Sequence, residues 1–441
     1  MKTRLLRPAL LGLVLLLTSA AAAQQNARRR LDLQDGDTLV FCGDSITHQC
    51  LYSQYVETYF YTRYPQRRIT FHNASVGGDK VGDALSRFDI DIAPYKPKYV
   101  PILLGMNDGS YQTFKPEIFQ TYETGMVQLI EKIRSLGATP IPMHPTMFDL
   151  RAREMRTEDG VSLERFKDYN SVLAFYGTWL QEHSRQQGLS FVNMFSRLNR
   201  ITYQQRRRNP DFTLIKDSVH PDAPGQLVMA ASLLDDVHAN RLVSALTVIR
   251  RGQTWRVRAN NGEVSEIGED DLPAFTFRAN SLPWVVPAEA AAGYRLYGAG
   301  GRLSSERLRV VGLPPGQYQL KIDGKAVGSW YHGSLAGNIA LHANRKTPQY
   351  QQALRVAMLN KERNEKVVHP LRDHYAALRN HYRQGLDKSD PKKFEEFLVA
   401  FKTKAAEFDA RAKEYEDKIY AANQPQAHRY EIVRVERKKP A

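Results

Sequence analysis

A regular alternation of strand-like and helix-like segments fills the first half of this sequence and limits the folds open to it. Between about Leu31 and Leu246, short apolar runs alternate with longer segments whose apolar residues recur at helical spacing. Strands are expected at 39–42, 68–72, 99–104, 139–143 and 190–192, and helices at 49–64, 80–88, 117–136, 163–187 and 224–246. This alternation predicts a parallel sheet with helices on both faces and with its chemistry at the carboxyl ends of the strands.

Length and charge narrow the class of protein. With 441 residues the chain is long enough for two or three domains, and its formal net charge is +15. Such a charge raises the possibility of nucleic-acid or membrane-surface binding. We favour the reading that Lys and Arg solvate an exported surface, because the positive charge is spread out and no nucleic-acid motif accompanies it. No nucleic-acid partner is expected.

The first 23 residues have the pattern of a secretory signal peptide. A charged start containing Lys2, Arg4 and Arg7 precedes the apolar run 10–17 and the small residues 19–23. The run is short for a bilayer span, although an uncleaved anchor is the alternative. We therefore expect export to the periplasm or the extracellular space, with no transmembrane span in the mature chain.

Two cysteines, Cys42 and Cys50, lie close together in the sequence. An exported protein could pair them, but spacing alone cannot settle their geometry. The favoured alternative is that both are small buried hydrophobic residues.

The second half of the chain has a different character. Short strand-like runs and a hairpin signal at Asp323-Gly324 predict a small β module over 248–345, after a catalytic domain over 31–247. Residues 346–425 keep apolar stripes at helical spacing on either side of a polar turn, which predicts an antiparallel helical hairpin. The tail, 426–441, could return as a strand to the β module. Sequence does not assign a role to either extension, nor an oligomeric state.

Four short blocks follow one another along the predicted catalytic domain. They are Phe-Cys-Gly-Asp-Ser at 41–45, Asn-Ala-Ser-Val-Gly-Gly-Asp at 73–79, Gly-Met-Asn-Asp at 105–108 and Asp-Ser-Val-His-Pro at 217–221. In this order they resemble the four blocks of the SGNH (GDSL) hydrolases, over roughly residues 35–245. The resemblance implies a three-layer α/β/α fold and ester hydrolysis, and the C-terminal extensions resemble those of some exported bacterial members.

The candidate catalytic residues are Ser45, His220 and Asp217. A serine hydroxyl is a poor nucleophile at neutral pH and needs a base, which in turn needs an orienting carboxylate. Ser45 follows a predicted strand, and Asp217 and His220 are spaced so that their side chains can meet on one face of a turn. We interpret His220 as the base and Asp217 as its orienting partner.

The oxyanion donors are assigned through the resemblance. It implies the Ser45 N–H, the Gly78 N–H and the Asn107 side-chain amide, which would stabilise the developing negative charge. Gly77 is the alternative to Gly78 if the register differs by one residue.

Five other polar residues near the blocks are given structural roles. Asp44 is expected to hold the serine turn, Asp79 to cap a helix, and Asp108 to shape the asparagine turn. His48 and His144 could line the pocket, but packing or surface roles are favoured. No zinc, Walker or Gly-x-Ser-x-Gly motif is present, so the sequence implies no metal and no cofactor.

These observations predict an exported serine esterase that works through an acyl-enzyme. A short-acyl ester on a carbohydrate is the first candidate substrate, and a lipid, lysophospholipid or thioester substrate is the second. A third possibility, from another class, is a retired hydrolase that binds a polymer or the cell envelope without catalysis.

Overall fold

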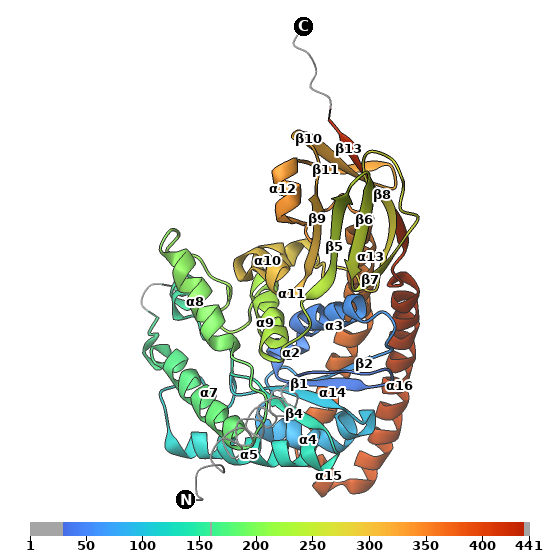
Figure 1. Ribbon diagram of the computed structural model, residues 1–441. Coiled ribbons are helices and arrows are strands. Elements are labelled where there is room, and N and C mark those ends of the chain that lie inside the picture. The colour runs from blue at the N-terminus through green and yellow to red at the C-terminus, as the bar shows by residue number, and fades with distance from the viewer. Residues whose placement is uncertain (1–29, 159–160, 436–441) are drawn as a thin grey trace, which may run out of the picture.

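The computed structural model describes residues 30–158 and 161–435. The signal peptide predicted at 1–23 therefore lies outside the described residues. Figure 1 shows a lower α/β domain, a β module above it and long C-terminal helices along one side.

A four-stranded sheet in the order β2-β1-β3-β4 forms the centre of the α/β domain, and every pair in it is parallel. The strands are β1 (Thr38–Gly43), β2 (Thr70–Ser75), β3 (Tyr99–Leu103) and β4 (Thr139–Pro142). The strand predicted at 190–192 is reduced to one parallel bridge, between Met143 and Val192. The parallel sheet confirms the predicted fold class.

Helices cover both faces of this sheet (Figure 1). α3 packs against α9 on one face, and α4 packs against α5 on the other. The helices of the domain are α2 (Ser45–His48), α3 (Leu51–Arg63), α4 (Val81–Asp91), α5 (Pro116–Ser135), α6 (Leu150–Glu154), α7 (Tyr169–Gln186), α8 (Met194–Arg206) and α9 (Ala223–Asp236), with short 3-10 turns at Ala93–Tyr95 and Glu164–Phe166. The layers are thus the α/β/α arrangement that the resemblance implied.

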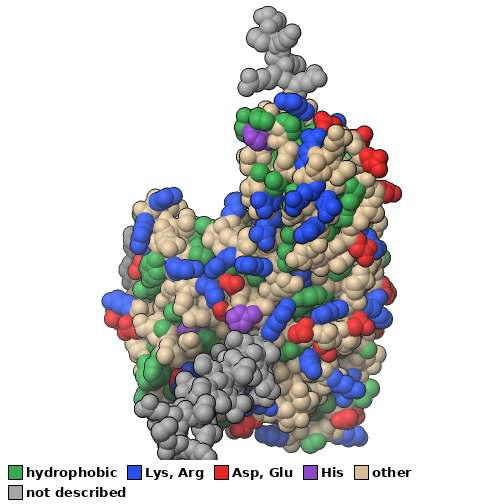
Figure 2. All heavy atoms as spheres, viewed as in Figure 1, with side chains coloured by type: hydrophobic (Ala, Val, Ile, Leu, Met, Phe, Trp, Pro, Cys, Tyr) green, Lys and Arg blue, Asp and Glu red, His purple; other side chains and the backbone are tan. Residues whose placement is uncertain are grey.

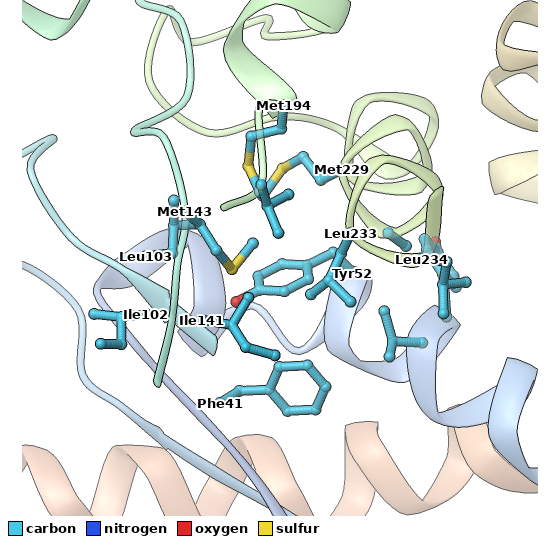
Figure 3. Close-up of a cluster of buried hydrophobic side chains, with 14 of the residues drawn as sticks. Phe41, Tyr52, Ile102, Leu103, Ile141, Met143, Met194, Met229, Leu233 and Leu234 are labelled. Carbon is cyan, nitrogen blue, oxygen red and sulfur yellow. The ribbon is translucent and has the colours of Figure 1, made fainter. Parts of the chain in front are cut away.

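A buried apolar cluster ties the strand ends to these helices. Figure 3 shows Tyr52 of α3 lying among Phe41, Ile141 and Met229, which come from β1, β4 and α9, and all four side chains are buried. The Tyr52 hydroxyl also bonds Thr47 Oγ1 at 2.9 Å, so the packed core reaches into helix α2. The position of the serine turn is therefore set by core packing.

The helix predicted over 224–246 is wrong beyond Asp236. α9 ends at Asp236, and β5 (Leu242–Arg251) begins six residues later. Beyond Ala245 buried and half-buried positions alternate along β5, as they do in a strand that packs one face on a core. The boundary expected between 247 and 248 therefore falls inside a strand.

Two sheets make up the β module. One has the order β12-β9-β5-β6 and the other the order β11-β10-β13-β8-β7. Their remaining strands are β6 (Thr254–Asn260), β7 (Gly262–Ser265), β8 (Ala274–Ala279), β9 (Ser305–Val311), β10 (Gln317–Ile322), β11 (Lys325–Tyr331), β12 (Ile339–Ala340) and β13 (Ala427–Arg434). Asp323 and Gly324 join β10 to β11 with φ of +49° and +74°, a turn that suits a tight hairpin. β13, from the end of the chain, pairs with both β10 and β8.

Short helices and a long hairpin complete the chain. The short helices are α10 (Ala291–Tyr297), α11 (Ala299–Leu303) and α12 (His332–Gly337), with a 3-10 turn at Ala288–Ala290. The hairpin has α13 (Pro348–Arg363), a π-helical turn (Asn364–Val368) and α14 (His369–Arg383) on one arm, α15 (Leu386–Ser389) at the bend and α16 (Pro391–Ala422) on the other.

The helical hairpin packs directly on the α/β domain. Leu371 and Tyr375 of α14, with Phe401 of α16, form a buried cluster with Val76, which follows β2. α14 also contacts α4 and β2. The turn after β2 is therefore enclosed by a helix from the far end of the chain.

Three remaining sequence expectations concern thiols, membrane spans and charge. Cys42 and Cys50 are both free and buried. Among the described residues, no helix combines the length and apolarity needed to cross a bilayer. Figure 2 shows Lys and Arg interspersed with Asp and Glu over the face in view.

Candidate active site

Ser45 lies where β1 ends and α2 begins. The Asp44 side chain accepts a hydrogen bond from the Ile46 N–H at 3.0 Å and so caps α2. Burial raises the pKa of Asp44 to about 7, in spite of that hydrogen bond. Asp44 thus supports the turn from beneath and leaves the Ser45 hydroxyl at the strand end.

His220 connects Ser45 to Asp217 through its two ring nitrogens. The Nε2 of His220 lies 2.8 Å from Ser45 Oγ, and its Nδ1 lies 2.6 Å from Asp217 Oδ2. A carboxylate accepts, so Nδ1 carries a proton and Nε2 has the lone pair that a base needs. The structure therefore brings together the three residues proposed for catalysis.

Asp217 is held by the turn that carries His220. Its Oδ1 accepts the Val219 N–H at 3.0 Å and the His220 N–H at 2.6 Å. Ser218, between them, has φ of +80°, a conformation that needs support from its surroundings. The same turn thus fixes both the carboxylate and the ring.

The two partners shift each other's pKa in opposite directions. The hydrogen bond to Asp217 raises the pKa of His220 above its ordinary value, against the effect of partial burial. Burial alone would raise the pKa of Asp217, but hydrogen bonds from the His220 side chain and from two backbone N–H groups hold it well below the usual range. Asp217 therefore stays ionised throughout the range in which His220 titrates.

This electrostatic pairing predicts the acid limb of the pH profile. A base must be neutral, so kcat/KM is expected to fall on acidification with a midpoint above about 6.5, the ordinary histidine value. In Asp217→Ala the residual activity should titrate at a lower pH, because the partner that raises the histidine pKa is gone. Steady-state kinetics from about pH 5 to 9 measure both midpoints. A flat wild-type profile would contradict a histidine base.

The hydrogen bonds of the glycine pair after β2 favour one of the two glycines as the oxyanion donor. The Gly77 N–H donates to His48 Nδ1 at 3.0 Å, so it is already engaged. Gly78 has φ of +79°, and its N–H meets no acceptor within the part of the chain that the structure describes. Of the two glycines, Gly78 is the one whose N–H can serve an oxyanion.

Asn107 is held with its amide nitrogen toward the same turn. Its Nδ2 donates to the Asp79 carbonyl at 3.0 Å, and the Tyr111 hydroxyl donates to its Oδ1 at 2.9 Å. These two bonds fix which end of the amide is the nitrogen. The second Nδ2 hydrogen remains available to a ligand.

Asp79 does not cap a helix, and that prediction is wrong. The N-cap residue of α4 is Lys80, and Asp79 lies fully buried with Oδ2 2.7 Å from Arg87 Nη1. The first turn of α4 is instead served by Asp108, whose Oδ1 accepts the Val81 N–H at 2.9 Å. Asp108 thereby joins the asparagine turn to the helix that follows the glycine turn.

The two uncertain histidines have different roles. His144 is buried, stacks on Phe195 with ring centroids 4.4 Å apart, and bonds the Pro145 carbonyl at 2.9 Å. It is therefore a packing residue, as favoured. His48 is not one, because its ring accepts the Gly77 N–H beside Ser45.

Residues of α14 reach the site and were missed by the sequence reasoning. Arg379 donates to the Gly77 carbonyl, and Arg383 Nη2 donates to the Gly78 carbonyl at 2.8 Å. Arg372, on the same helix, donates to the Ser75 carbonyl at 2.8 Å. The available signal was the spacing of three arginines, seven and four residues apart, on one helix face.

Comparisons with known proteins agree with this architecture. Residues 41–228 match the model of the GDSL-like lipase/acylhydrolase family. An acetylxylan esterase of Geobacillus stearothermophilus is 24% identical over 229 residues, which cover 47% of this chain and 96% of that protein. An uncharacterized lipoprotein of Bacillus subtilis is 40% identical over 73 residues, and the match spans only 30% of its length and 16% of this chain.

One solved structure resembles nearly the whole chain. It is a gut microbial diltiazem-metabolizing enzyme, 24% identical, with a TM-score of 0.80 over 93% of this chain and 100% of that one. The likeness shows that the combination of α/β domain, β module and helical hairpin occurs in another protein. Residues 41–228, with their parallel α/β/α fold, belong to the SGNH (GDSL) hydrolase superfamily, whose members are ester-hydrolysing enzymes.

Proposed function

We propose that this protein is an exported serine esterase that removes short acyl groups from a carbohydrate through an acyl-enzyme. The observation that carries the mechanism is the Ser45–His220–Asp217 chain, with contacts of 2.8 and 2.6 Å. Export rests on the basic and apolar pattern of residues 1–23.

In the proposed first step, Ser45 Oγ attacks the ester carbonyl carbon while His220 Nε2 takes the hydroxyl proton. The Ser45 and Gly78 N–H groups and the Asn107 amide stabilise the negative charge that develops on the carbonyl oxygen. When the tetrahedral intermediate collapses, His220 returns the proton to the departing alcohol. Water then attacks the acyl-enzyme by the same route, which releases the acid and restores Ser45.

The carbohydrate substrate is supported by two observations. One relative, of which the match covers 96%, is an acetylxylan esterase. The site is also open, since the side chains of His220 and Asp217 are 30% and 42% exposed. An open site suits a bulky alcohol that stays largely outside the protein, whereas a long acyl chain needs a deep apolar channel.

A series of aryl esters with increasing acyl length tests this proposal, run beside acetate release from acetylated xylan. We expect kcat/KM to be highest for acetyl and to fall by about tenfold or more for chains of eight carbons, because an open site offers long chains no compensating burial. Acetate should be released from the polysaccharide. A preference for long acyl chains or lysophospholipids would favour the lipid alternative.

A further inference from the structure

The backbone of the Gly77–Gly78 pair is bonded at every polar atom but one. The Gly77 N–H donates to His48, the Gly77 carbonyl accepts from Arg379, and the Gly78 carbonyl accepts from Arg383. The Gly78 N–H is the one group without an acceptor in the described residues. Two of the three contacts come from α14, about 300 residues further along the chain.

Arg379 binds the carbonyl oxygen of the peptide group whose N–H belongs to Gly78. The Gly77 carbonyl and the Gly78 N–H belong to one planar trans peptide, so they point in opposite directions. A guanidinium bound to the oxygen therefore turns the N–H away from α14. A Cβ added at Gly77 would lie 3.9 Å from Ser45 Cβ, so the turn lies directly against the nucleophile.

The Arg379 guanidinium also makes the Gly78 N–H a stronger hydrogen-bond donor. A hydrogen bond to a peptide oxygen polarises the peptide, which makes the N–H at its other end a better donor. A charged, largely buried group that donates to the peptide oxygen polarises the peptide more than a neutral group does. The Arg379 side chain is such a group, since it is only 12% exposed. Arg383 is itself fixed by two bonds of 2.7 Å to Asp83.

His48 provides a third restraint, by accepting the Gly77 N–H, and its ring lies beside Asp373 of α14. Its Nδ1 accepts the Gly77 N–H, so the proton of a neutral ring must lie on Nε2, which is 3.2 Å from Asp373 Oδ1. Burial, with the nearby charges of Arg372 and His369, lowers the pKa of His48 to about 4, although Asp373 opposes this. His48 is therefore neutral at neutral pH and keeps accepting from Gly77.

The same tautomer argues against a metal at this place. His48, His369 and Asp373 offer ligand atoms within 4.8 Å of one another. A metal would need the lone pair of His48 Nε2, but a neutral imidazole has a single lone-pair nitrogen, and here it accepts from Gly77. The cluster is better explained as a support for the glycine turn.

We propose that α14 completes the oxyanion hole, with Arg379 and Arg383 as positioning residues that aim the Gly78 N–H at the developing oxyanion. This inference rests on the proposed esterase function. It makes the helical hairpin a working part of the active site, in addition to any part it plays in binding a polymer.

The test measures kcat and KM on an aryl acetate for wild type, Arg379→Gln, Arg379→Lys and Arg383→Gln. Arg379→Gln is expected to lose about 10- to 100-fold in kcat with little change in KM, less than the 10²–10³-fold expected for Asn107→Ala, which removes a donor outright. Arg379→Lys keeps a cation and should recover part of the loss. Affinity for a trifluoromethyl ketone, which forms a tetrahedral oxyanion adduct, should fall by the same factor as kcat/KM.

Controls separate positioning from folding and from the proposed function. Arg355→Gln changes an exposed arginine on α13 and should leave all parameters unchanged. Melting temperatures identify unfolded variants, and Arg383→Gln remains informative if Arg379→Gln does not fold, because the Arg383 side chain is 43% exposed. A folded Arg379→Gln with normal kcat would overturn the inference, and so would loss of wild-type activity on chelation that a divalent ion restores. Absence of Ser45-dependent turnover in wild type would instead overturn the proposed function.

Discussion

Replacing Ser45 with alanine is expected to reduce turnover of an aryl acetate by roughly 10³-fold or more, since the hydroxyl is the proposed nucleophile and its loss disables the whole triad. The fold should survive, because among the described residues the Ser45 hydroxyl hydrogen-bonds only to His220, at 2.8 Å, in a partly open site. Labelling by a fluorophosphonate, which requires an activated serine, should vanish together with turnover. Melting temperature and steady-state kinetics measure the two effects separately.

A matched control is Ser135→Ala, which removes an exposed serine hydroxyl at the end of α5. It should leave turnover and labelling at wild-type levels. Near-normal hydrolysis by purified Ser45→Ala would show that the mechanism is wrong. A wild-type protein that neither hydrolyses esters nor accepts the label would favour the retired-hydrolase alternative.

His220→Ala is expected to be nearly as damaging as the serine change, because no other group lies within hydrogen-bond distance of Ser45 Oγ in the described residues. Asp217→Ala should cost less, since a histidine without its carboxylate still accepts a proton. The double variant Ser45→Ala/His220→Ala should be no worse than either single variant, because both remove the same unit. Turnover of an aryl acetate by all four variants tests this order.

His238→Asn is the matched control for the histidine change. His238 is exposed just after α9 and has φ of +53°, a conformation that asparagine tolerates well. This variant should keep wild-type activity. Additive losses in the double variant would mean that Ser45 and His220 act independently. Their 2.8 Å contact predicts the opposite.

The sequence by itself determined the parallel α/β/α fold, because apolar periodicity and glycine or asparagine turns are local signals. It also placed Ser45, Gly78, Asn107, Asp217 and His220 at strand ends or in one late turn, which in a parallel sheet bring separate segments to one edge. The choice of Gly78 over Gly77 was open in the sequence. The bond between Gly77 and His48 favours Gly78.

Two predictions made from neighbouring residues were wrong, because contacts with distant segments of the chain determine the structure there. The segment 242–246 contains good helix formers, yet it forms a strand because β6 and β9 flank it and satisfy its backbone. Asp79 is a residue type that commonly caps helices and lies just before α4, but its carboxylate forms an ion pair with the buried Arg87. Lys80 then takes the cap position.

The tertiary structure alone decided what surrounds the glycine turn. Arg379 contacts the Gly77 carbonyl across 302 residues, and no local pattern records so distant a pairing. The contact depends on the apolar packing of Leu371 and Tyr375 of α14 against Val76, which lays the helix along the end of β2. Sequence supplied the reacting groups, since each is defined by its own short motif, whereas the surroundings that orient them arise only when distant parts of the chain pack together.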